Sequence, residues 1–256
     1  MAEDLEKVNM SKVSIIMPAY NAEKTISKSI ESVQAQTYKN WELIITDDKS
    51  TDSTKNIIQK YAKEDLRVKY FSNNSDKSGA WAARNNSLKN VKGRYIAFLD
   101  SDDTWLPCKL QDQLVAMRSS GCSASHSAYY RVNKAGNYLG MKKAKKIVSY
   151  NDMLRKNHIG NLTGIYDVTK IGVVFQENVG HEDYDMWLRI LQKTDSVGVQ
   201  ESCANYLVQP NSLSSNKLKA ATWHYNILKK QPNVNRFKVY LLFICYCFSA
   251  IKARIL

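Results

Sequence analysis

The 256-residue chain is predicted to have an α/β fold, in which helices flank a mostly parallel, Rossmann-like central sheet. Short apolar runs alternate with segments whose apolar residues recur at helical spacing, which is the pattern of βα units. The runs are continuous, without regular polar residues between the apolar ones. Strands that are buried on both faces of a parallel sheet have this composition.

The elements are expected in a regular order. Strands should form where the apolar runs lie, at 13–17 (ending at Pro18), 41–45, 68–71 and 94–99. Helices should form between and after the strands. The first carries Ile26, Ile30 and Val33, and the second carries Ile57, Ile58 and Tyr61 after a cap within 50–53. The third covers 79–88, and the fourth follows Pro107 and carries Leu110, Leu114 and Met117. From about Ser123 to Asn137 the chain is richer in Tyr, Ser and Val. We expect antiparallel strands there, which would make the second half of the fold mixed.

Polar residues directly follow three of these four strands. The three groups are Pro18-Ala19-Tyr20-Asn21, Asp47-Asp48 and Asp100-Ser101-Asp102-Asp103. The carboxyl ends of parallel strands meet at one edge of a sheet, and ligands bind there in open α/β folds. Helix capping explains one such group. Three groups at the same edge predict a binding site.

The acidic turn 100–103 predicts a metal-assisted diphosphate site. The chain contains neither GxGxxG nor GxxxxGK[ST], so no glycine loop is available to hold phosphate. Clustered carboxylates repel phosphate unless a cation lies between them, and Mn²⁺ or Mg²⁺ accepts oxygen ligands from both. We therefore expect the turn to bind such an ion. Asp47 and Asp48 would then be free to accept hydrogen bonds from a base or a ribose.

Positive charge is concentrated towards the end of the chain. The formal net charge is +13, and residues 205–256 contain eight Lys and Arg but no Asp or Glu. A second basic cluster lies at 142–146. This asymmetry indicates an anionic partner. We expect an anionic membrane surface and no nucleic acid; a merely solvated basic tail is the alternative.

The apolar run 239–251 predicts how the chain would meet such a surface. Its thirteen residues are fewer than the ~20 that span a bilayer. Arg236 and Lys238 precede the run, and Lys252 and Arg254 follow it. Basic flanks around a short apolar segment are typical of an interfacial helix. A helix buried against the rest of the protein is the alternative.

The cysteines and the first residues bear on location. Five cysteines with no CxxC pair argue against a disulfide framework and a zinc site. The first ten residues are polar and lack the apolar core of a signal peptide. We expect a cytoplasmic protein that is peripheral at the inner face of the cell membrane.

The chain resembles the family-two glycosyltransferases, inverting enzymes with the GT-A fold. The resemblance lies in VSIIMPAYNAEKTISKSIESVQAQTYKNWELIITDDKSTDST and in GAWAARNNSLKNVKGRYIAFLDSDDTWLPCKL, and it is strong over about residues 12–115. The stretch HEDYDMWLR at 181–189 resembles the "ED" segment of the same family.

This resemblance implies a role for each matching residue. It implies nucleotide-sugar contacts for Pro18, Ala19, Tyr20, Asn21, Asp47, Asp48, Arg84, Asp100 and Ser101. One of Asp47 and Asp48 would recognise uracil. Asp100-Ser101-Asp102 matches the DXD motif, so Asp102 and Asp100 would bind Mn²⁺ or Mg²⁺. Asp183 resembles the catalytic base, and Lys49 stands where the family more often has a small residue such as glycine.

The implied reaction moves a hexose or N-acetylhexosamine from a UDP-sugar to a hydroxyl of a glycan acceptor. The acceptor would be a lipid-linked oligosaccharide in the synthesis of O-antigen, capsule or lipooligosaccharide. A metal-dependent hexosyltransferase of this kind needs a Lewis acid for the leaving diphosphate and a base for the acceptor hydroxyl. Together with the polar first residues and the basic, apolar last ones, the resemblance predicts four parts of the chain. They are a flexible arm (1–10), a nucleotide-sugar-binding half (11–115), an acceptor-binding half with the base (116–205) and a basic helical membrane-association segment (206–256).

Two other functions stay open. A sugar-phosphate nucleotidyltransferase would carry a glycine- and arginine-rich loop after the first strand, where this chain has PAYN. A non-catalytic membrane- or nucleic-acid-binding module would explain the basic tail but not the acidic strand ends.

Four of the polar residues also have plainer structural interpretations. Arg84 is then a helix-surface arginine, and Asp103 a cap of the helix near Trp105. Asp185 and Arg189 would form a surface ion pair at i,i+4.

Overall fold

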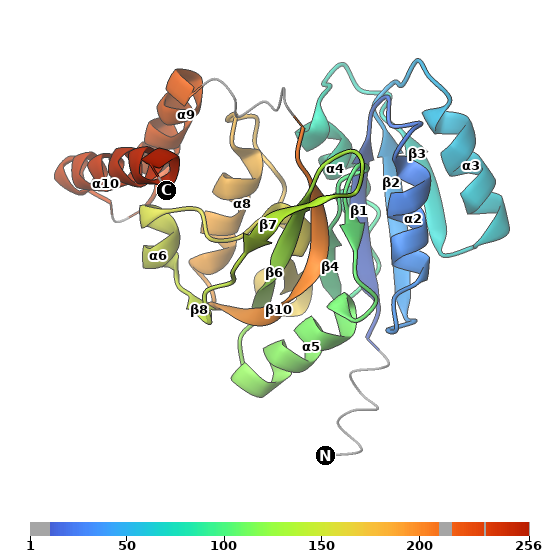
Figure 1. Ribbon diagram of the computed structural model, residues 1–256, viewed down its shortest axis with the longest axis horizontal. Helices are drawn as coiled ribbons and strands as arrows, with labels where there is room; N and C mark the ends of the chain where they lie inside the picture. Colours follow the sequence, from blue (N-terminus) through green and yellow to red (C-terminus); the bar gives the residue numbers. More distant parts are fainter. Residues whose placement is uncertain (1–10, 210–216, 233, 256) are drawn as a thin grey trace.

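The computed structural model describes residues 11–209, 217–232 and 234–255, which form a mixed sheet with helices on both faces (Figure 1). The expected arm at 1–10 lies outside the described residues. The strands are β1 (Val13–Ala19), β2 (Trp41–Asp47), β3 (Val68–Ser72), β4 (Tyr95–Phe98), β5 (Thr104–Trp105), β6 (Ala124–Val132), β7 (Tyr138–Lys142), β8 (Ile147–Val148), β9 (Ile165–Asp167) and β10 (Ser196–Leu207). The helices are α2 (Ile26–Gln34), α3 (Thr54–Glu64), α4 (Ala80–Leu88), α5 (Lys109–Ser120), α6 (Tyr150–Arg155), α7 (Val168–Ile171), α8 (Glu182–Leu191), α9 (Lys217–Lys230) and α10 (Arg236–Ile255), with a 3₁₀ turn at Asn161–Thr163.

The sheet has the strand order β3-β2-β1-β4-β9-β6-β10-β5. Its first four strands are parallel, as predicted. β9 is antiparallel to β4 and β6, and β7 is antiparallel to β6. The expected antiparallel strands at 123–137 are therefore present, although β6 also pairs in parallel with β10. The predicted division at residue 115 falls within α5, and the sheet continues across it.

Both faces of β1 are buried, which explains its unbroken apolar run. Successive side chains of a strand point to opposite faces. Val13, Ile15 and Met17 join a core with α2, α3 and α5, whereas Ile16 joins a second core with α4 and α8. The strand continues through Pro18 to Ala19, beyond the predicted end. Pro18 removes no ladder bond on the side of β4, because that pairing ends at Ile16 and Phe98.

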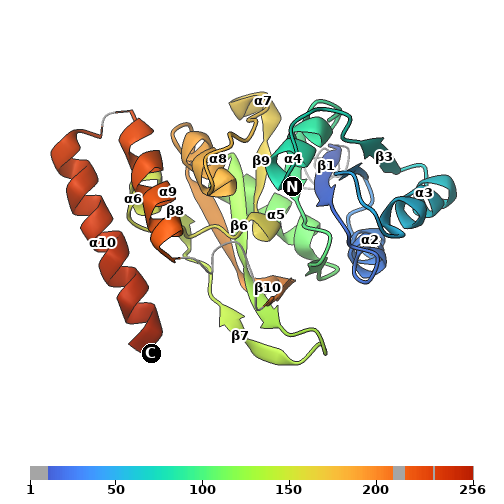
Figure 2. The same cartoon turned by 90° about the horizontal axis from the view of Figure 1, so that it is seen from above.

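α9 and α10 pack against each other, and α10 also packs on α6, at one end of the molecule (Figure 2). Val239 and Leu242 of α10 are buried against the protein. Phe237, Tyr240 and Leu241 are 70%, 61% and 46% exposed. The helix therefore has one apolar side that is buried against the protein and one that is exposed. The side chains of Lys252 and Arg254 lie outside the described residues.

No helix in the described part of the chain combines the length and the apolar character that crossing a bilayer would need.

Candidate active site

The parallel pairing of β1, β2 and β4 brings the predicted polar groups to one edge of the sheet. Ala19 is in register with Asp47, and Ile16 with Phe98, two residues before Asp100. Pro18 and Ala19 are buried strand residues, whereas the side chain of Tyr20 is exposed. The carboxyl ends of these strands thus form a single polar rim.

The backbone of this rim is unusual at two predicted positions. Asn21 and Lys49 have positive φ angles of 46° and 64°, a region that favours glycine. The Asn21 amide donates to Ser50 Oγ over 3.0 Å, and Asn21 Oδ1 accepts from the Thr51 amide over 2.9 Å. Lys49 Nζ donates to the Ser75 carbonyl over 2.9 Å. The left-handed conformation at Lys49 gives the family's preference for a small residue there a physical reason.

Asp48 serves the protein's own structure. Its Oδ1 accepts from Asn73 Nδ2 over 2.5 Å, and its Oδ2 accepts from the Gly79 amide over 2.6 Å. The expectation that both carboxylates are free is therefore wrong for Asp48, which ties residues 73–79 to the end of β2. Asp47 is buried, and its Oδ1 accepts one long bond of 3.4 Å from the Ser50 amide.

Arg84 lies at the centre of the site. It is only 8% exposed, so it is not the helix-surface arginine of the plainer interpretation. Its Nη2 pairs with Asp100 Oδ1 at 2.6 Å, and its Nη1 donates to Gln176 Oε1 over 3.2 Å. Burial acts to lower the pKa of Arg84, but the carboxylates of Asp100, Asp183 and Glu182 outweigh burial and raise it. The acidic turn and the start of α8 therefore face the same guanidinium.

The start of α8 supplies the second acidic group of the site. Glu182, Asp183 and Asp185 all lie in its first turn, where the helix dipole favours negative charge. Asp183 is thus brought within electrostatic range of Arg84, 99 positions earlier in the chain.

Asp185 and Arg189 form the predicted i,i+4 ion pair, at 2.9 Å. The pair is not a surface feature, because Asp185 is buried. Arg189 Nη2 also donates to the Phe175 carbonyl over 2.7 Å, so the pair anchors the segment before α8.

Asp103 neither caps the helix near Trp105 nor faces the rim. It is buried, and its Oδ1 accepts from the Leu207 amide over 2.7 Å. Asp102 Oδ2 accepts from Gln209 Nε2 over 2.6 Å. The acidic turn therefore holds the end of β10 and the residues just beyond it.

A hard divalent cation fits the chemistry of this turn. Burial, followed by the charge of Asp100, raises the pKa of Asp102, and burial with both neighbouring carboxylates raises that of Asp103 well above its usual value. A bound cation would offset this repulsion. Within the described residues there is no group of three or more His, Cys, Asp or Glu placed to hold a metal. The fit therefore rests on one or two carboxylates completed by ligand oxygens, the mode that Mg²⁺ prefers.

Three side chains of the site had no counterpart in the sequence-based prediction: Gln176, Asn73 and Gln209. Gln176 is buried, binds Arg84, and is held by Asn85 through two bonds of 2.8 Å. Arg84 and Asn85 lie more than 90 positions before Gln176, so no local pattern could indicate these contacts. Asn73 follows the third strand directly, and that position was the one available signal.

The family model described as "Glycosyl transferase family 2" matches residues 14–174. The chain belongs to this family.

The matches with individual relatives extend over nearly the whole chain. The Escherichia coli protein WfgD is 40% identical to this chain, and the match covers 84% of this chain and 85% of WfgD. WfaP, also from Escherichia coli, is 38% identical, and the match covers 94% of this chain and 97% of WfaP. Both are named UDP-Glc:alpha-D-GlcNAc-diphosphoundecaprenol beta-1,3-glucosyltransferase. Bacillus subtilis TuaG, whose name refers to teichuronic acid biosynthesis, is 37% identical, and the match covers 95% of this chain and 97% of TuaG.

Solved structures confirm the GT-A fold of this family-two chain. S. aureus TarS 1–349 in complex with UDP-GlcNAc matches with a TM-score of 0.72 at 18% identity, over 92% of this chain and 71% of that one. The mannosyltransferase PcManGT of Pyrobaculum calidifontis, in complex with GDP-Man and Mn²⁺, matches with a TM-score of 0.64 at 14% identity. This match covers 96% of this chain and 75% of that one. At these identities the likeness concerns the fold.

Proposed function

We propose that this family-two enzyme transfers a hexose from a UDP-sugar, with inversion, to a hydroxyl of a sugar linked through a diphosphate to a polyprenol. The observation that carries the proposal is the near full-length identity to WfgD and WfaP, whose names give UDP-Glc and a diphosphoundecaprenol-linked GlcNAc. UDP-glucose is accordingly the first donor to test. The assembly of a surface polysaccharide is the setting in which such a product is used.

The residues of the rim fit this chemistry. The part of the rim that would meet the nucleoside is lined or braced by Asn21, Asp47 and Asp48. The part that would meet the diphosphate is lined by Arg84, Asp100 and Ser101. Mn²⁺ or Mg²⁺ held by Asp102 and Asp100 would supply Lewis-acid stabilisation of the leaving diphosphate. Asp183 would accept the proton of the attacking hydroxyl. Because Arg84 faces both carboxylate groups, it balances their charge while donor and acceptor are bound.

The test is transfer by the purified protein to N-acetylglucosaminyl diphosphate bearing an alkyl chain, with UDP-glucose, UDP-GlcNAc or GDP-mannose and with Mn²⁺ or EDTA. We expect a disaccharide product with a β linkage, seen by mass spectrometry and NMR, from a UDP-sugar only. Asp183→Asn should bind UDP normally and lose about 10²–10⁴-fold in turnover. Asp195→Asn, at an exposed position outside the site, is the matched control. Unchanged turnover in Asp183→Asn would discard the base assignment.

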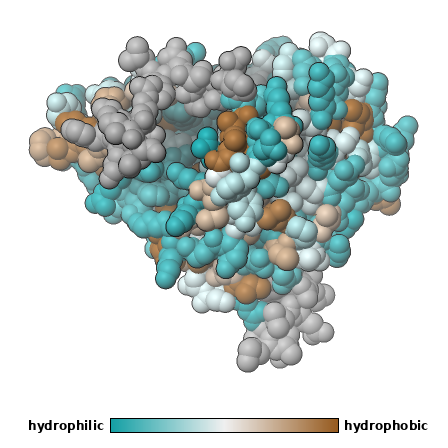
Figure 3. Space-filling model, viewed as in Figure 1, coloured by the Kyte–Doolittle hydropathy of each residue, from teal (hydrophilic) through white to brown (hydrophobic). Residues whose placement is uncertain are grey.

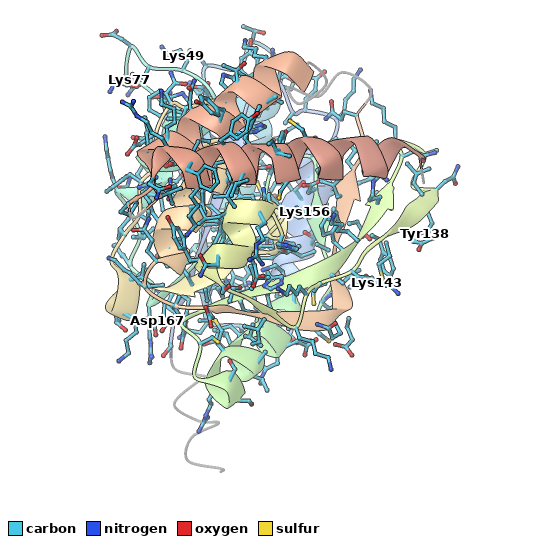
Figure 4. All side chains as sticks on the ribbon, turned by 90° about the vertical axis from the view of Figure 1, so that its left-hand side faces the viewer. Lys49, Lys77, Tyr138, Lys143, Lys156 and Asp167 are labelled. Atoms are coloured by element: carbon cyan, nitrogen blue, oxygen red, sulfur yellow. The ribbon has the colours of Figure 1, made fainter. Side chains whose placement is uncertain are left out.

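We also propose that α10 docks on an anionic membrane at the inner face of the cell membrane. Phe237, Tyr240 and Leu241 are spaced i, i+3 and i+4, so their exposed side chains share one face of the helix. Figure 3 shows a small group of apolar residues at the edge of the molecule where α10 lies. Lys143 and Lys156 appear on the face that α10 crosses in Figure 4. Each lysine or arginine near an anionic surface contributes about 1 kcal/mol.

Vesicle sedimentation tests this docking. The wild-type protein should sediment with phosphatidylglycerol vesicles, less so at high salt, whereas Phe237→Ser/Tyr240→Ser/Leu241→Ser should stay in the supernatant. Leu66→Ser, at an exposed apolar position on the far side of the fold, is the control. Equal sedimentation of the triple variant and the wild type would refute the proposal.

A further inference from the structure

A groove of about 720 Å³ lies between α9 and the segment that leads into α8. The α8 side contributes Asn178, Val179 and Gly180, and the other wall is built from α9. Gly180 precedes Asp183 by three residues, so the groove runs up to the start of the helix that carries the candidate base. Figures 1 and 2 show α9 beside α8 at this end of the molecule.

One face of α9 forms this wall of the groove. Lys219, Trp223, Asn226, Ile227 and Lys230 are spaced i, i+4, i+7, i+8 and i+11, which places them in a single stripe along the helix. The lysines stand at the two ends of the stripe, and Trp223 and the exposed Asn226 lie between them, above the fully buried Ile227. The groove is therefore cationic at its ends and carries an indole ring and an amide in its middle.

The charge of the groove is strongly one-sided. Lys229 adds a third lysine to the lining, and α9 contains no Asp or Glu. Glu177 lies 3.7 Å from Lys230 Nζ, and both side chains are more than half exposed. An exposed pair of this kind contributes little stability, so Lys230 is available for an anionic ligand.

Trp223 contacts the segment that leads to the candidate base. A Cβ on Gly180, whose φ is +88°, would lie 2.2 Å from Trp223 Cδ2, so the indole ring contacts this backbone directly. The ring of His181, two residues before Asp183, meets Trp223 edge-on at 5.4 Å. Lys219 Nζ lies 5.0 Å from the Trp223 ring centroid. An aromatic face with an ammonium beside it thus stands next to the start of α8.

We propose that this groove is the acceptor site, and that its lysines bind the diphosphate of a diphosphate-linked sugar lipid while Trp223 supports the sugar. The inference rests on the proposed function for the class of acceptor. An aromatic face offers an apolar surface to the C–H groups of a pyranose ring, and lysine ammonium groups bind phosphate oxygens through charge-assisted hydrogen bonds. The contact between Trp223 and Gly180 places that sugar close to Asp183. The remaining apolar side chain with exposed surface, Val179, suits the first carbons of the lipid.

Calorimetry with the full chain tests the inference without turnover. The probe is N-acetylglucosaminyl diphosphate carrying a short alkyl chain, and the comparison ligand has the same sugar and chain joined by a neutral glycosidic link. The wild type should bind the diphosphate probe at least about tenfold more tightly, and the preference should shrink at high salt. Lys219→Gln/Lys230→Gln should weaken binding of the diphosphate probe at least about tenfold, because each lysine contact with a charged group is worth about that much. Binding of UDP with Mn²⁺ should be unchanged in the double variant.

Two further variants sharpen the result. Lys28→Gln, at an exposed position on α2, should bind both ligands as the wild type does. Trp223→Leu should weaken both ligands by a similar factor, because it removes the sugar support and leaves the lysines in place. The inference is overturned if the double-lysine variant binds the diphosphate probe like the wild type, or if the wild type binds both ligands equally. If the probe binds as expected but receives sugar from no UDP-sugar, the proposed function fails and the groove assignment stands.

Discussion

Replacing Lys109 by methionine should stabilise the protein, and the gain should depend on pH. Lys109 opens α5 and is completely buried. Its Nζ has no hydrogen-bond partner among the described residues and lies 4.0 Å from the ring centroid of Trp105. Burial lowers the pKa of Lys109 from 10.5 to about 7. The folded protein therefore holds this proton less tightly than the unfolded chain does.

The size of the effect follows from the pKa change. At 1.36 kcal/mol per pH unit, lowering the pKa from 10.5 to about 7 destabilises the fold by about 5 kcal/mol. The cation–π contact with Trp105 offsets about 1–2 kcal/mol of this. Below pH 7 both states are protonated, and the penalty is complete. Between pH 7 and 10.5 only the unfolded chain holds the proton, so the stability of the wild type rises with pH and the penalty disappears.

Urea unfolding at pH 6, 7.5 and 9 measures this difference. Lys109→Met should be about 3 kcal/mol more stable than the wild type at pH 6. Because the wild type regains about 2.7 kcal/mol over the two pH units between pH 7 and pH 9, nearly all of this difference should be gone at pH 9. Lys28→Met, which removes an exposed lysine, should follow the wild-type pH profile. A destabilised Lys109→Met variant, or a stability difference that is the same at all three pH values, would refute the reasoning.

Three further predictions concern the site and the core. Asp48→Asn should lower the free energy of unfolding by about 1–3 kcal/mol, because an amide NH₂ would face the Gly79 amide in place of an acceptor. It should also raise the KM for the nucleotide sugar by loosening residues 73–79. Urea unfolding measures the first effect and steady-state kinetics the second. Gly164→Ala should destabilise the fold by at least about 3 kcal/mol, since its Cβ would lie 1.9 Å from Trp187 Cζ2 in a filled core, and a normal urea midpoint would contradict this. Asp102→Asn should abolish the Mn²⁺-dependent part of UDP binding in calorimetry; binding that still responds to EDTA as the wild type does would remove Asp102 from the proposed metal site.

The parallel half of the fold was predictable because its information is local. Runs such as 13–17 and 41–45 are buried on both faces, so their composition alone marks them as strands. The short strands β5 and β8 have two residues each and are defined by their pairing with β10, which no local pattern reveals. The direction of β9 depends equally on distant partners.

The site shows the same division. The rim residues follow strands directly, and strand order then brings them together. The roles of Arg84 and Asp103 were harder to predict, because they depend on Gln176, Asp183 and Leu207, which are 92 or more positions away. Burial decided both cases: a buried guanidinium needs carboxylate partners, and a buried carboxyl needs a donor. Neither condition can be read before the tertiary structure is known.

The hydrogen-bonded sheet that runs without interruption from β3 to β5 has a mechanical consequence. Rotating the first four strands against the rest would require breaking the backbone bonds between β4 and β9, so the two halves cannot hinge like separate lobes. Admission of donor and acceptor must then leave this sheet intact. The polar residues at the carboxyl ends of β1, β2 and β4 therefore belong to one continuous sheet, and they cannot separate as two rigid lobes would.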